Sequence, residues 1–550
     1  MAPPSAIEVT SVTDTTGVTL PDPLAAHVKS NEVHGRRRKA DKSQWGVAAP
    51  ADSVNFRLKS YEGKPKARRW DHIISSEARI RKGNSLKQAA RFLSKPGLIS
   101  LGGGLPSSEY FPFEELSLKV PAIGHFSEEE TRDSGVVLTI GKHDLAAEKS
   151  TFDIATAFNY GQGSGSAQLL RWITEHTEMV HSPPYEDWRC TMTIGSTSAL
   201  DMALRILARP GDTMLYEEFT FSAAIETATP MGIAPAAVPM DDEGLLPDEM
   251  DALLSNWDEA ARGRKPHLLY TIPTGQNPTG ATQSAARRRA LYAVCRKHDI
   301  FILEDEPYYF LQMAPYAESP PGSQAEQGEV APEPTSHESF LDALVPSFLS
   351  MDTDGRVMRM DSFSKVLSPG SRVGWITAPQ QLVEKYQKHA DVSTQGPSGM
   401  AQLLLFKLLD EHWGHAGYLD WLMHIRRQYT LRRDGILRAC AKFLPREVVG
   451  WKPPMAGMFH WMKVDVKKHP RFGELRVEEI EERVFMRVIE HGALVMRGSW
   501  FLAEPGEGLG GERLFFRATY AAAPAQKIEE GIRRLGEAVR EEFGLGRSEE

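Results

Sequence analysis

The stretch DSFSKVLSPGSRVGW, residues 361–375, places a lysine among several serines, shortly after an apolar run. Lys365 follows Ser364 directly, and Arg372 lies seven residues further on. A lysine that is partly removed from water and close to another cation has a lowered pKa, so more of it is the neutral amine that attacks carbonyl groups. A surface lysine is the ordinary alternative. The surroundings favour a lysine that forms a Schiff base with a carbonyl compound.

A second motif, Gly195-Ser196-Thr197, follows the apolar run TMTI and opens an amphipathic stretch. Small residues at a helix start leave backbone N–H groups free, and the positive end of the helix dipole favours an anion there. The same three residues are also an ordinary helix cap. The motif is therefore compatible with phosphate binding and does not establish it alone.

Two further apolar runs end in polar residues. The turn TGQNPTG, residues 274–280, presents the amide of Asn277, although turn chemistry alone accounts for its Gly and Pro residues. EDEPYYF, residues 304–310, puts Asp305 and Tyr308 just beyond the run IFIL. Buried carboxylates are costly unless a cation pairs with them, and a solvated acidic loop is the alternative.

Together these four places describe one ligand that has a phosphate, a protonated ring nitrogen, a ring oxygen and an aldehyde. Pyridoxal 5′-phosphate has all four groups. Asp305 would keep the pyridine nitrogen protonated and make the ring an electron sink, while Asn277 and Tyr308 would bind the phenolate oxygen. Lys365 would hold the aldehyde.

The elements that position these residues alternate between strand and helix. CTMTIG (190–195), TMLYEE (213–218), HLLYTIP (267–273) and IFILEDE (300–306) predict strands, and amphipathic helical patterns separate them. This order predicts an α/β fold with a mostly parallel sheet covered by helices. Ligands bind beyond the carboxyl ends of strands in such sheets, which is where the four motifs lie. From about residue 400 onward a helical pattern and the strand MFHWMKVDV predict a separate α+β unit.

Composition excludes several classes of function. The net charge of −9 arises from 73 acids and 64 bases spread along the chain, which argues against nucleic acid or an anionic membrane as a partner. No run of about 18 apolar residues could span a bilayer, and the first thirty residues lack a secretory signal pattern. Three separated cysteines predict neither a disulfide framework nor a metal site. We therefore expect a cytoplasmic enzyme without a metal.

In the order NPTG, EDEPYYF and DSFSKVLSPGSRVGW, these motifs resemble the fold-type I aminotransferases of class I/II, which depend on pyridoxal 5′-phosphate. The resemblance implies a large domain with a mostly parallel seven-stranded sheet and a smaller α+β domain. It also implies that Lys365 shuttles protons and that Arg517, in LFFRATY, binds the substrate carboxylate with Asn277 nearby. The other cofactor contacts that it implies are a phosphate clamp and a stacked ring: Ser362, Ser364, Arg372, the backbone of Ser196 and Thr197, and Phe221.

Two segments extend the resemblance to assembly and substrate. FNYGQGSGSAQLLRW, residues 158–172, is similar to the family segment whose tyrosine, here Tyr160, reaches the cofactor phosphate of the neighbouring subunit. That implies a homodimer with shared active sites. ISLGGGLPSSEYFPF, residues 99–113, resembles the loop over the substrate, with Gly103 or Gly104 near the carboxylate or, alternatively, serving only a tight bend.

Under this resemblance we divide the chain into four parts. They are an irregular arm at 1–75, an N-terminal part of the small domain at 76–155, a large cofactor-binding domain at 156–395 with a polar, disordered insertion at 317–339, and a C-terminal small domain at 396–550. The basic run at 34–42 is either a nuclear address or simply solvated.

The most similar branch is that of fungal aromatic aminotransferases and the related kynurenine and 2-aminoadipate enzymes. We therefore expect transamination between phenylalanine, tyrosine or tryptophan and a 2-oxo acid such as 2-oxoglutarate. A broad kynurenine or 2-aminoadipate activity is the alternative. Two other possibilities keep the fold and change the function: β-elimination or decarboxylation with the same cofactor, or a ligand sensor fused to a DNA-binding segment.

Overall fold

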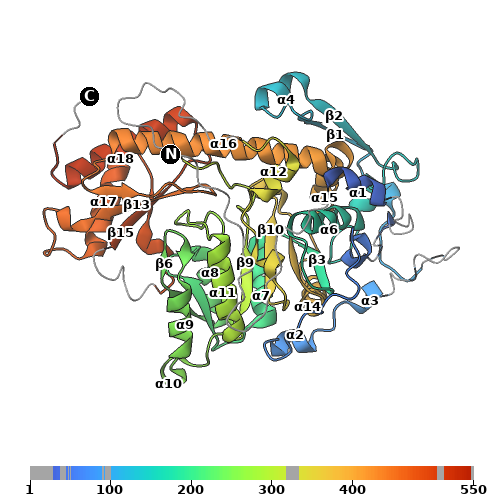
Figure 1. Cartoon of the computed structure of the whole chain (residues 1–550). Coiled ribbons are helices and arrows are strands. Elements are labelled where there is room, and N and C mark those ends of the chain that lie inside the picture. The colour runs from blue at the N-terminus through green and yellow to red at the C-terminus, as the bar shows by residue number, and fades with distance from the viewer. Residues whose placement is uncertain are drawn as a thin grey trace, which may run out of the picture.

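The computed structural model in Figure 1 describes residues 29–37, 45–47, 49, 51–88, 92, 99, 101–316, 333–504 and 513–546. Its centre is a seven-stranded sheet whose strands lie in the order β3 (Trp188–Thr193), β11 (Gly374–Pro379), β10 (Val357–Ser362), β9 (Phe301–Asp305), β8 (Leu268–Thr271), β4 (Thr213–Glu217) and β5 (Ala234–Val238). Strand β11 is antiparallel to both neighbours, and the other pairs are parallel. The predicted mostly parallel sheet is confirmed.

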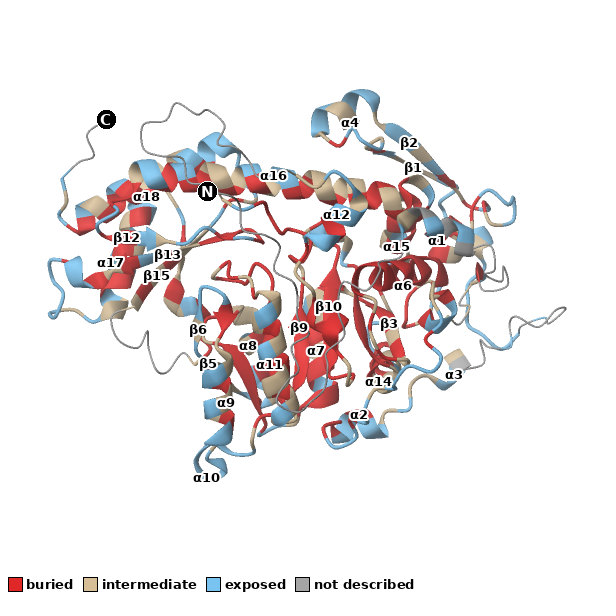
Figure 2. Ribbon diagram, in the orientation of Figure 1, coloured by how far each residue is buried: buried red, intermediate tan, exposed pale blue. Residues whose placement is uncertain are grey.

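Helices bury both faces of this sheet, because alternate residues of each strand point to opposite sides. Phe301 and Leu303 of β9 join one core with α7 (Gly195–Leu207) and α14 (Gln380–Ala390). Ile302 joins a second core with α9 (Pro247–Ser255) and α11 (Ala285–Lys297). The strands are therefore buried almost throughout, as the central red arrows in Figure 2 show. Continuous apolar runs are what such a two-sided burial requires.

The C-terminal part forms the smaller α+β unit that the sequence predicts. Its antiparallel sheet has the strand order β12 (Val449–Trp451), β13 (Phe459–Asp465), β15 (Arg513–Thr519) and β14 (Met496–Arg497). Helices α17 (Val477–Glu490) and α18 (Ala525–Glu542) pack on it and close a separate hydrophobic core. One face of this sheet lies toward the large sheet, and β15 brings Arg517 to that boundary.

A single long helix joins the two units. Helix α16 (Gly414–Phe443) has 30 residues, and Figure 1 shows it running across the top of both sheets. Tyr418 and Leu422 near its start belong to the core of the large domain, while Ile436 and Cys440 belong to that of the small domain. The part predicted to begin at residue 396 thus contributes first to the core of the large domain and then to that of the small domain. A continuous helical pattern does not show where a helix passes from one core to another.

The predicted N-terminal divisions also differ from the packing. Trp45, Phe56 and Trp70 are buried in the core of the large domain, and the Trp70 indole donates to Gly355 O at 2.6 Å. The segment assigned to 1–75 as an arm thus contributes to the main core within its described part.

Residues 115–141 form what we call the hairpin unit: β1 (Glu115–Val120), α4 (Glu128–Ser134) and β2 (Val136–Gly141). Ile140 of this unit packs with Leu403 and Phe406 of α15 (Gly399–Phe406), far along the chain. In Figure 1 the unit lies above one end of α16, at the opposite end of that helix from α17 and α18. The hairpin unit, which belongs to the part predicted at 76–155, therefore packs beside the large domain at a distance from α17 and α18, a long-range pairing that local sequence patterns do not encode.

Two of the predicted segments fall partly outside the described residues. Of the insertion at 317–339, residues 317–332 lie outside, and α12 (His337–Asp342) begins within the remainder. Of the basic run at 34–42, residues 38–42 lie outside, and the preceding residues end α1 (Ser30–Arg37), which packs on α16. Within the described ranges no helix is long and apolar enough to cross a membrane, and no group of three or more His, Cys, Asp or Glu side chains could hold a metal ion.

Candidate active site

The polar residues predicted from four strand ends meet at the carboxyl edge of the large sheet, where the small domain faces it. Lys365 is close enough to Arg372 and Asp305 for both charges to act on its amine. Tyr308 likewise experiences the charges of Asp305 and Arg517. Residues that are more than 200 positions apart in the sequence therefore share one site.

Lys365 lies in a tight turn that follows β10. The turn is closed by backbone hydrogen bonds from Phe363 N to Val373 O at 3.1 Å and from Leu367 N to Phe363 O at 2.9 Å. The amine is half-buried, and burial lowers the pKa of Lys365; the Arg372 charge lowers it further, whereas Asp305 opposes the change. The structure thus gives the lysine the environment that favours a neutral amine.

A cradle of donors surrounds the start of α7. Gly195 has a φ of +76°, and a Cβ atom on it would lie 2.5 Å from Arg372 Nη2, so only glycine fits. Arg372 reaches Ser364 Oγ at 3.4 Å and Ile194 O at 3.3 Å, and Ser364 Oγ lies 2.7 Å from Ser362 Oγ. The N-cap residue of α7, Ile194, makes no side-chain hydrogen bond to the first N–H groups of the helix. Free N–H groups, two hydroxyls and a guanidinium suit a phosphate.

Asp305 ends β9 as a buried carboxylate. Its Oδ2 accepts a hydrogen bond from the Tyr270 hydroxyl at 2.7 Å, while Oδ1 is buried and has no hydrogen-bond partner among the described residues. Burial raises the pKa of Asp305 to about 6, although the Tyr270 hydroxyl and the nearby Ser196 hydroxyl lower it. Tyr308, three residues on, is also buried, with its ring edge-on to Phe459 at 5.7 Å between centroids. A buried carboxylate oxygen without a partner is matched by a cationic donor such as a protonated ring nitrogen.

Asn277 and Arg517 connect the two domains at the site. Asn277 lies in the turn after β8, and its Oδ1 accepts from Arg517 Nη1 at 2.6 Å. The Arg517 guanidinium lies 4.3 Å from the Phe459 ring centre and 4.6 Å from that of Phe501, and burial lowers its pKa. The aromatic rings hold the planar fork in one orientation.

The turn that carries Asn277 is fixed by its neighbour. Gln276 Nε2 donates to Glu217 Oε2 at 3.0 Å and to Phe219 O at 2.6 Å, and Gln276 Oε1 accepts from Thr279 N at 2.9 Å. Glu217 is buried, which raises its pKa to about 7 although the hydrogen bonds from Gln276 and others lower it. Gln276 thus connects this turn to β4 and to the segment that follows β4.

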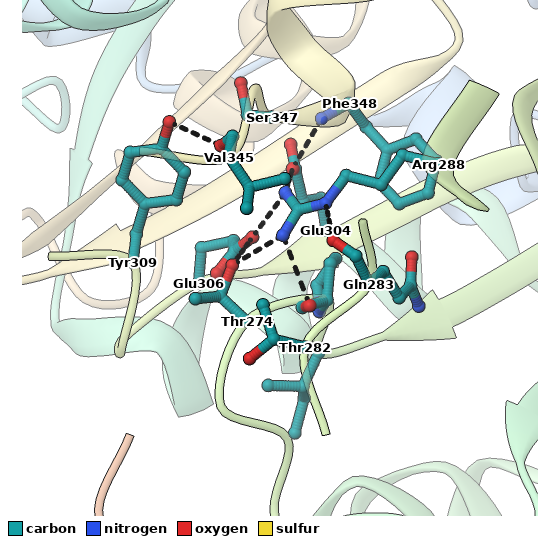
Figure 3. Close-up of polar contacts among 12 residues, drawn as sticks. Thr274, Thr282, Gln283, Arg288, Glu304, Glu306, Tyr309, Val345, Ser347 and Phe348 are labelled. Carbon is teal, nitrogen blue, oxygen red and sulfur yellow. Dashed lines mark hydrogen bonds and ion pairs between the residues drawn. The ribbon is translucent and has the colours of Figure 1, made fainter. Parts of the chain in front are cut away.

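Two of the three acids in EDEPYYF have a structural role. Glu304 and Glu306 are buried together with Arg288 and Arg359. Figure 3 shows Arg288 beside both acids. Arg288 Nη1 lies 3.3 Å from Glu306, and Arg359 Nη1 lies 3.3 Å from Glu304. Burial raises the pKa of Glu306, and both arginines oppose this. The alternative of a solvated acidic loop is wrong, because each buried acid has a cation beside it or a specific donor.

Four other predicted site residues have different surroundings within this chain. Phe221 is half-buried at the start of α8 (Ser222–Ala228), against the core of the large domain. Tyr160 is 58% exposed and lines a separate small pocket with Gln402. Gly103 and Gly104 are exposed, and a Cβ atom on either would have no neighbour closer than 3.8 Å. The structure of one chain therefore does not bring Tyr160, Gly103 or Gly104 to the site.

Sequence reasoning missed several supporting residues. Tyr270, Gln276, Arg288 and Arg359 were not singled out, although the sequence contained a signal for Arg359. It lies in the run RVMRM, which predicts a buried strand, and a buried arginine requires acidic partners. The acids of the neighbouring strand supply them.

Residues 141–535 match the family of class I and II aminotransferases, and the chain belongs to this family. An aromatic amino acid aminotransferase of Schizosaccharomyces pombe is 42% identical over 478 residues, which cover 86% of this chain and 98% of that protein. An L-tyrosine:2-oxoglutarate aminotransferase of Tapinella panuoides is 33% identical over 524 residues, which cover 88% and 98%. Among solved structures, aminotransferase Aro8 from Candida albicans has a TM-score of 0.79 at 41% identity, with 88% of this chain and 100% of that chain covered. The predicted family and fold class are confirmed.

Pyridoxal 5′-phosphate is the cofactor of this enzyme class. The residues present fit it. Asp305 offers a buried oxygen without a hydrogen-bond partner in the described part of the chain, Gly195 leaves room beside Arg372, and Lys365 offers a half-buried side chain. These features lie at separate places around one site, as the separate groups of the cofactor require.

Proposed function

We propose that the protein transfers amino groups between an aromatic L-amino acid, namely phenylalanine, tyrosine or tryptophan, and a 2-oxo acid such as 2-oxoglutarate. The observation that carries the proposal is the contact of Arg517 with Asn277, which holds a guanidinium fork that suits a carboxylate near Tyr308, the residue on which the charge of Asp305 also acts. The relatives named for aromatic amino acids and for tyrosine and 2-oxoglutarate support this choice of substrates.

Each part of the cofactor has a residue to hold it. Asp305 would bind the ring nitrogen, Asn277 and Tyr308 the ring oxygen, and Lys365 the aldehyde carbon. The phosphate contacts would come from the donor cradle described above, namely Ser362, Ser364, Arg372 and the N–H groups of Ser196 and Thr197, and Phe221 would stack on the ring. When bound, the cofactor supplies an electron sink for the charge left at the substrate carbon.

Lys365 Nζ would remove the proton from the substrate Cα, which it can do only as a neutral amine, and the ammonium group formed in this way would later return a proton. Its lowered pKa supports this role. Arg517 would bind the α-carboxylate of both substrates through two parallel hydrogen bonds. Phe459 and Phe501 beside it form an apolar wall that suits an aromatic substrate better than a charged one.

We also propose a cytoplasmic homodimer with shared sites. Tyr160 is exposed, and so are Gly103 and Gly104 in a segment that also exposes Leu101. A partner subunit that covered this surface would bring Tyr160 to the partner's phosphate cradle. Coexpressed Lys365→Ala and Tyr160→Ala chains should then recover activity above that of either variant alone, because a mixed dimer contains one intact site. A monomer in sedimentation analysis, or no recovery, would exclude shared sites.

The direct test of function is the absorbance spectrum of the enzyme with cofactor. L-phenylalanine should convert the lysine-bound band to the pyridoxamine band, 2-oxoglutarate should restore it, and Lys365→Ala should lack the normal starting band. Conversion by 2-aminoadipate or kynurenine but not phenylalanine would replace the aromatic substrate. Release of ammonia or carbon dioxide without a 2-oxo acid would instead indicate elimination or decarboxylation.

A further inference from the structure

The turn that carries Lys365 is tied to α16 by one side chain. Trp421 Nε1 donates a hydrogen bond to Val366 O at 2.7 Å. Val366 directly follows Lys365, and its side chain is buried in the core of the large domain. The carbonyl at the centre of the lysine turn therefore has its donor on an element about 55 residues further along the chain. A backbone group held in this way has less freedom than the turn alone would give it.

Trp421 is itself held by the hairpin unit. Phe126, in the connection between β1 and α4, lies edge-on to Trp421 at 5.6 Å between ring centres and edge-on to Trp413 at 5.9 Å. The two tryptophan rings stack on each other at 5.6 Å. Phe126 is buried, although α4 and much of the hairpin around it are exposed. The hairpin unit, although largely exposed, thus contributes one buried ring to an aromatic cluster, and Trp421 of this cluster donates to the lysine turn.

The position of this turn matters because Lys365 lies between opposing charges. Arg372 favours the neutral amine and Asp305 favours the charged one. Coulomb interactions change with distance, so a small displacement of the turn alters the balance between the two. An anchor on Val366 O fixes the amine relative to both groups.

We propose that Trp421 is a positioning residue for Lys365, and that the hairpin unit, through Phe126, holds Trp421 against the lysine turn. The inference rests on the proposed role of Lys365 as the amine that binds the cofactor and moves the proton. It gives the hairpin unit a function in the reaction, although the unit supplies no residue that contacts Lys365 in this structure.

Trp421→Phe tests this, because it keeps a ring in the cluster and removes only the indole donor. Absorbance of the cofactor-bound enzyme is followed against pH, which reports on Lys365 and not on His424 in the same aromatic cluster. We expect the midpoint to move by about 0.5 pH unit or more, since losing one hydrogen bond changes an equilibrium about 3- to 10-fold. With phenylalanine, kcat should fall about 5-fold while KM stays within about 2-fold, because positioning acts on the proton transfer and not on carboxylate binding.

Trp413→Phe is the matched control. Its indole donates to Pro121 O at 3.3 Å, and His412 Nε2 also lies 3.0 Å from that oxygen, so this carbonyl keeps a partner. This control keeps a ring at position 413 and the Trp421 donor to Val366 O, so its midpoint should lie much closer to that of the wild type than the midpoint of Trp421→Phe does. Phe126→Leu, which leaves the donor intact, should move the midpoint in the same direction as Trp421→Phe but less.

A wild-type midpoint and kcat in Trp421→Phe would overturn the proposal. If that variant does not fold, a wild-type titration of Phe126→Leu would overturn it instead. The titration needs only bound cofactor, so it is informative even if the wild-type enzyme ignores phenylalanine, which would count against the proposed substrate alone.

Discussion

Tyr270→Phe should weaken cofactor binding at mildly acidic pH. The Tyr270 hydroxyl donates to Asp305 Oδ2 at 2.7 Å, and both groups are buried. This hydrogen bond stabilises the ionised carboxylate and opposes the burial that raises the pKa of Asp305 to about 6. Phenylalanine has the same ring without the donor, so the substitution removes the largest of the effects that oppose burial, while Ser196 and Arg359 remain, and it leaves the packing almost unchanged.

The size of the effect follows from the charge of the acceptor. A hydrogen bond to a charged group contributes about 1.5–3 kcal/mol, and one pKa unit corresponds to about 1.4 kcal/mol. The pKa of Asp305 should therefore rise by about 1 to 2 in the variant. Protonated Asp305 cannot pair with a protonated ring nitrogen, so affinity for the cofactor falls as the pH drops below this pKa. The fall should begin at a higher pH in the variant than in the wild type.

The assay is titration of cofactor-free enzyme with pyridoxal 5′-phosphate at pH values from about 5 to 8, on either side of the Asp305 pKa. Lys365 affects the same equilibrium, but equally in both proteins. Tyr216→Phe is the matched control, since Tyr216 is a buried neighbour of Tyr270 whose hydroxyl has no hydrogen-bond partner among the described residues. Identical pH midpoints for Tyr270→Phe and Tyr216→Phe would refute the reasoning.

Three further substitutions test other parts of the site. Gly195→Ala places a methyl group 2.5 Å from Arg372 Nη2 at a φ of +76°, so the cofactor dissociation constant should rise about 10-fold or more; an unchanged constant in the same titration would contradict the cradle. Arg359→Met removes the cation beside three buried acids and should lower the free energy of unfolding by about 3–5 kcal/mol. Arg296→Met, at a less buried ion pair, should lower it by less than about 1 kcal/mol. Denaturant midpoints that move equally in the two variants would be inconsistent with this difference. Arg517→Lys loses the planar fork, and KM for both the amino acid and the 2-oxo acid should rise about 10-fold or more; a rise for only one substrate would disprove a shared carboxylate site.

The sequence predicted the fold class well because its signals are local. The strands around Asp305 and Lys365 are short apolar runs that end in polar residues, and helical patterns separate them. Such runs show where a strand ends, and in a parallel sheet the ends meet at one edge. The strand ends therefore predicted Lys365, Asp305 and Asn277 together, whereas Arg517 was predicted from the family resemblance. In the structure Asp305 acts on the amine of Lys365, and Arg517 donates to Asn277.

The features that were missed depend on contacts between distant segments. Tyr270 is an ordinary strand residue until the fold places its hydroxyl against Asp305. The long helix α16 is continuous in pattern, yet its two halves enter different cores. The position of the hairpin unit is decided by Phe126 meeting Trp413 and Trp421, a pairing that no local period encodes. Tertiary packing, not propensity, fixes each of these.

Glu304 and Asp305 end β9, and Glu306 follows them. This run of three acids serves two purposes. Successive strand residues point to opposite faces, so Asp305 points to the face with Tyr270 while Glu304 and Glu306 point to the other. There Arg359 forms an ion pair with Glu304 at 3.3 Å and donates two hydrogen bonds of 2.8 Å to Asp361, the first residue of the lysine stretch. The buried ion pairs therefore connect the strand that carries Asp305 to the strand that leads to Lys365. Because breaking one partner of such a network is costly, the network resists changes in the spacing of the two strands, and this spacing determines how far the carboxylate lies from the amine.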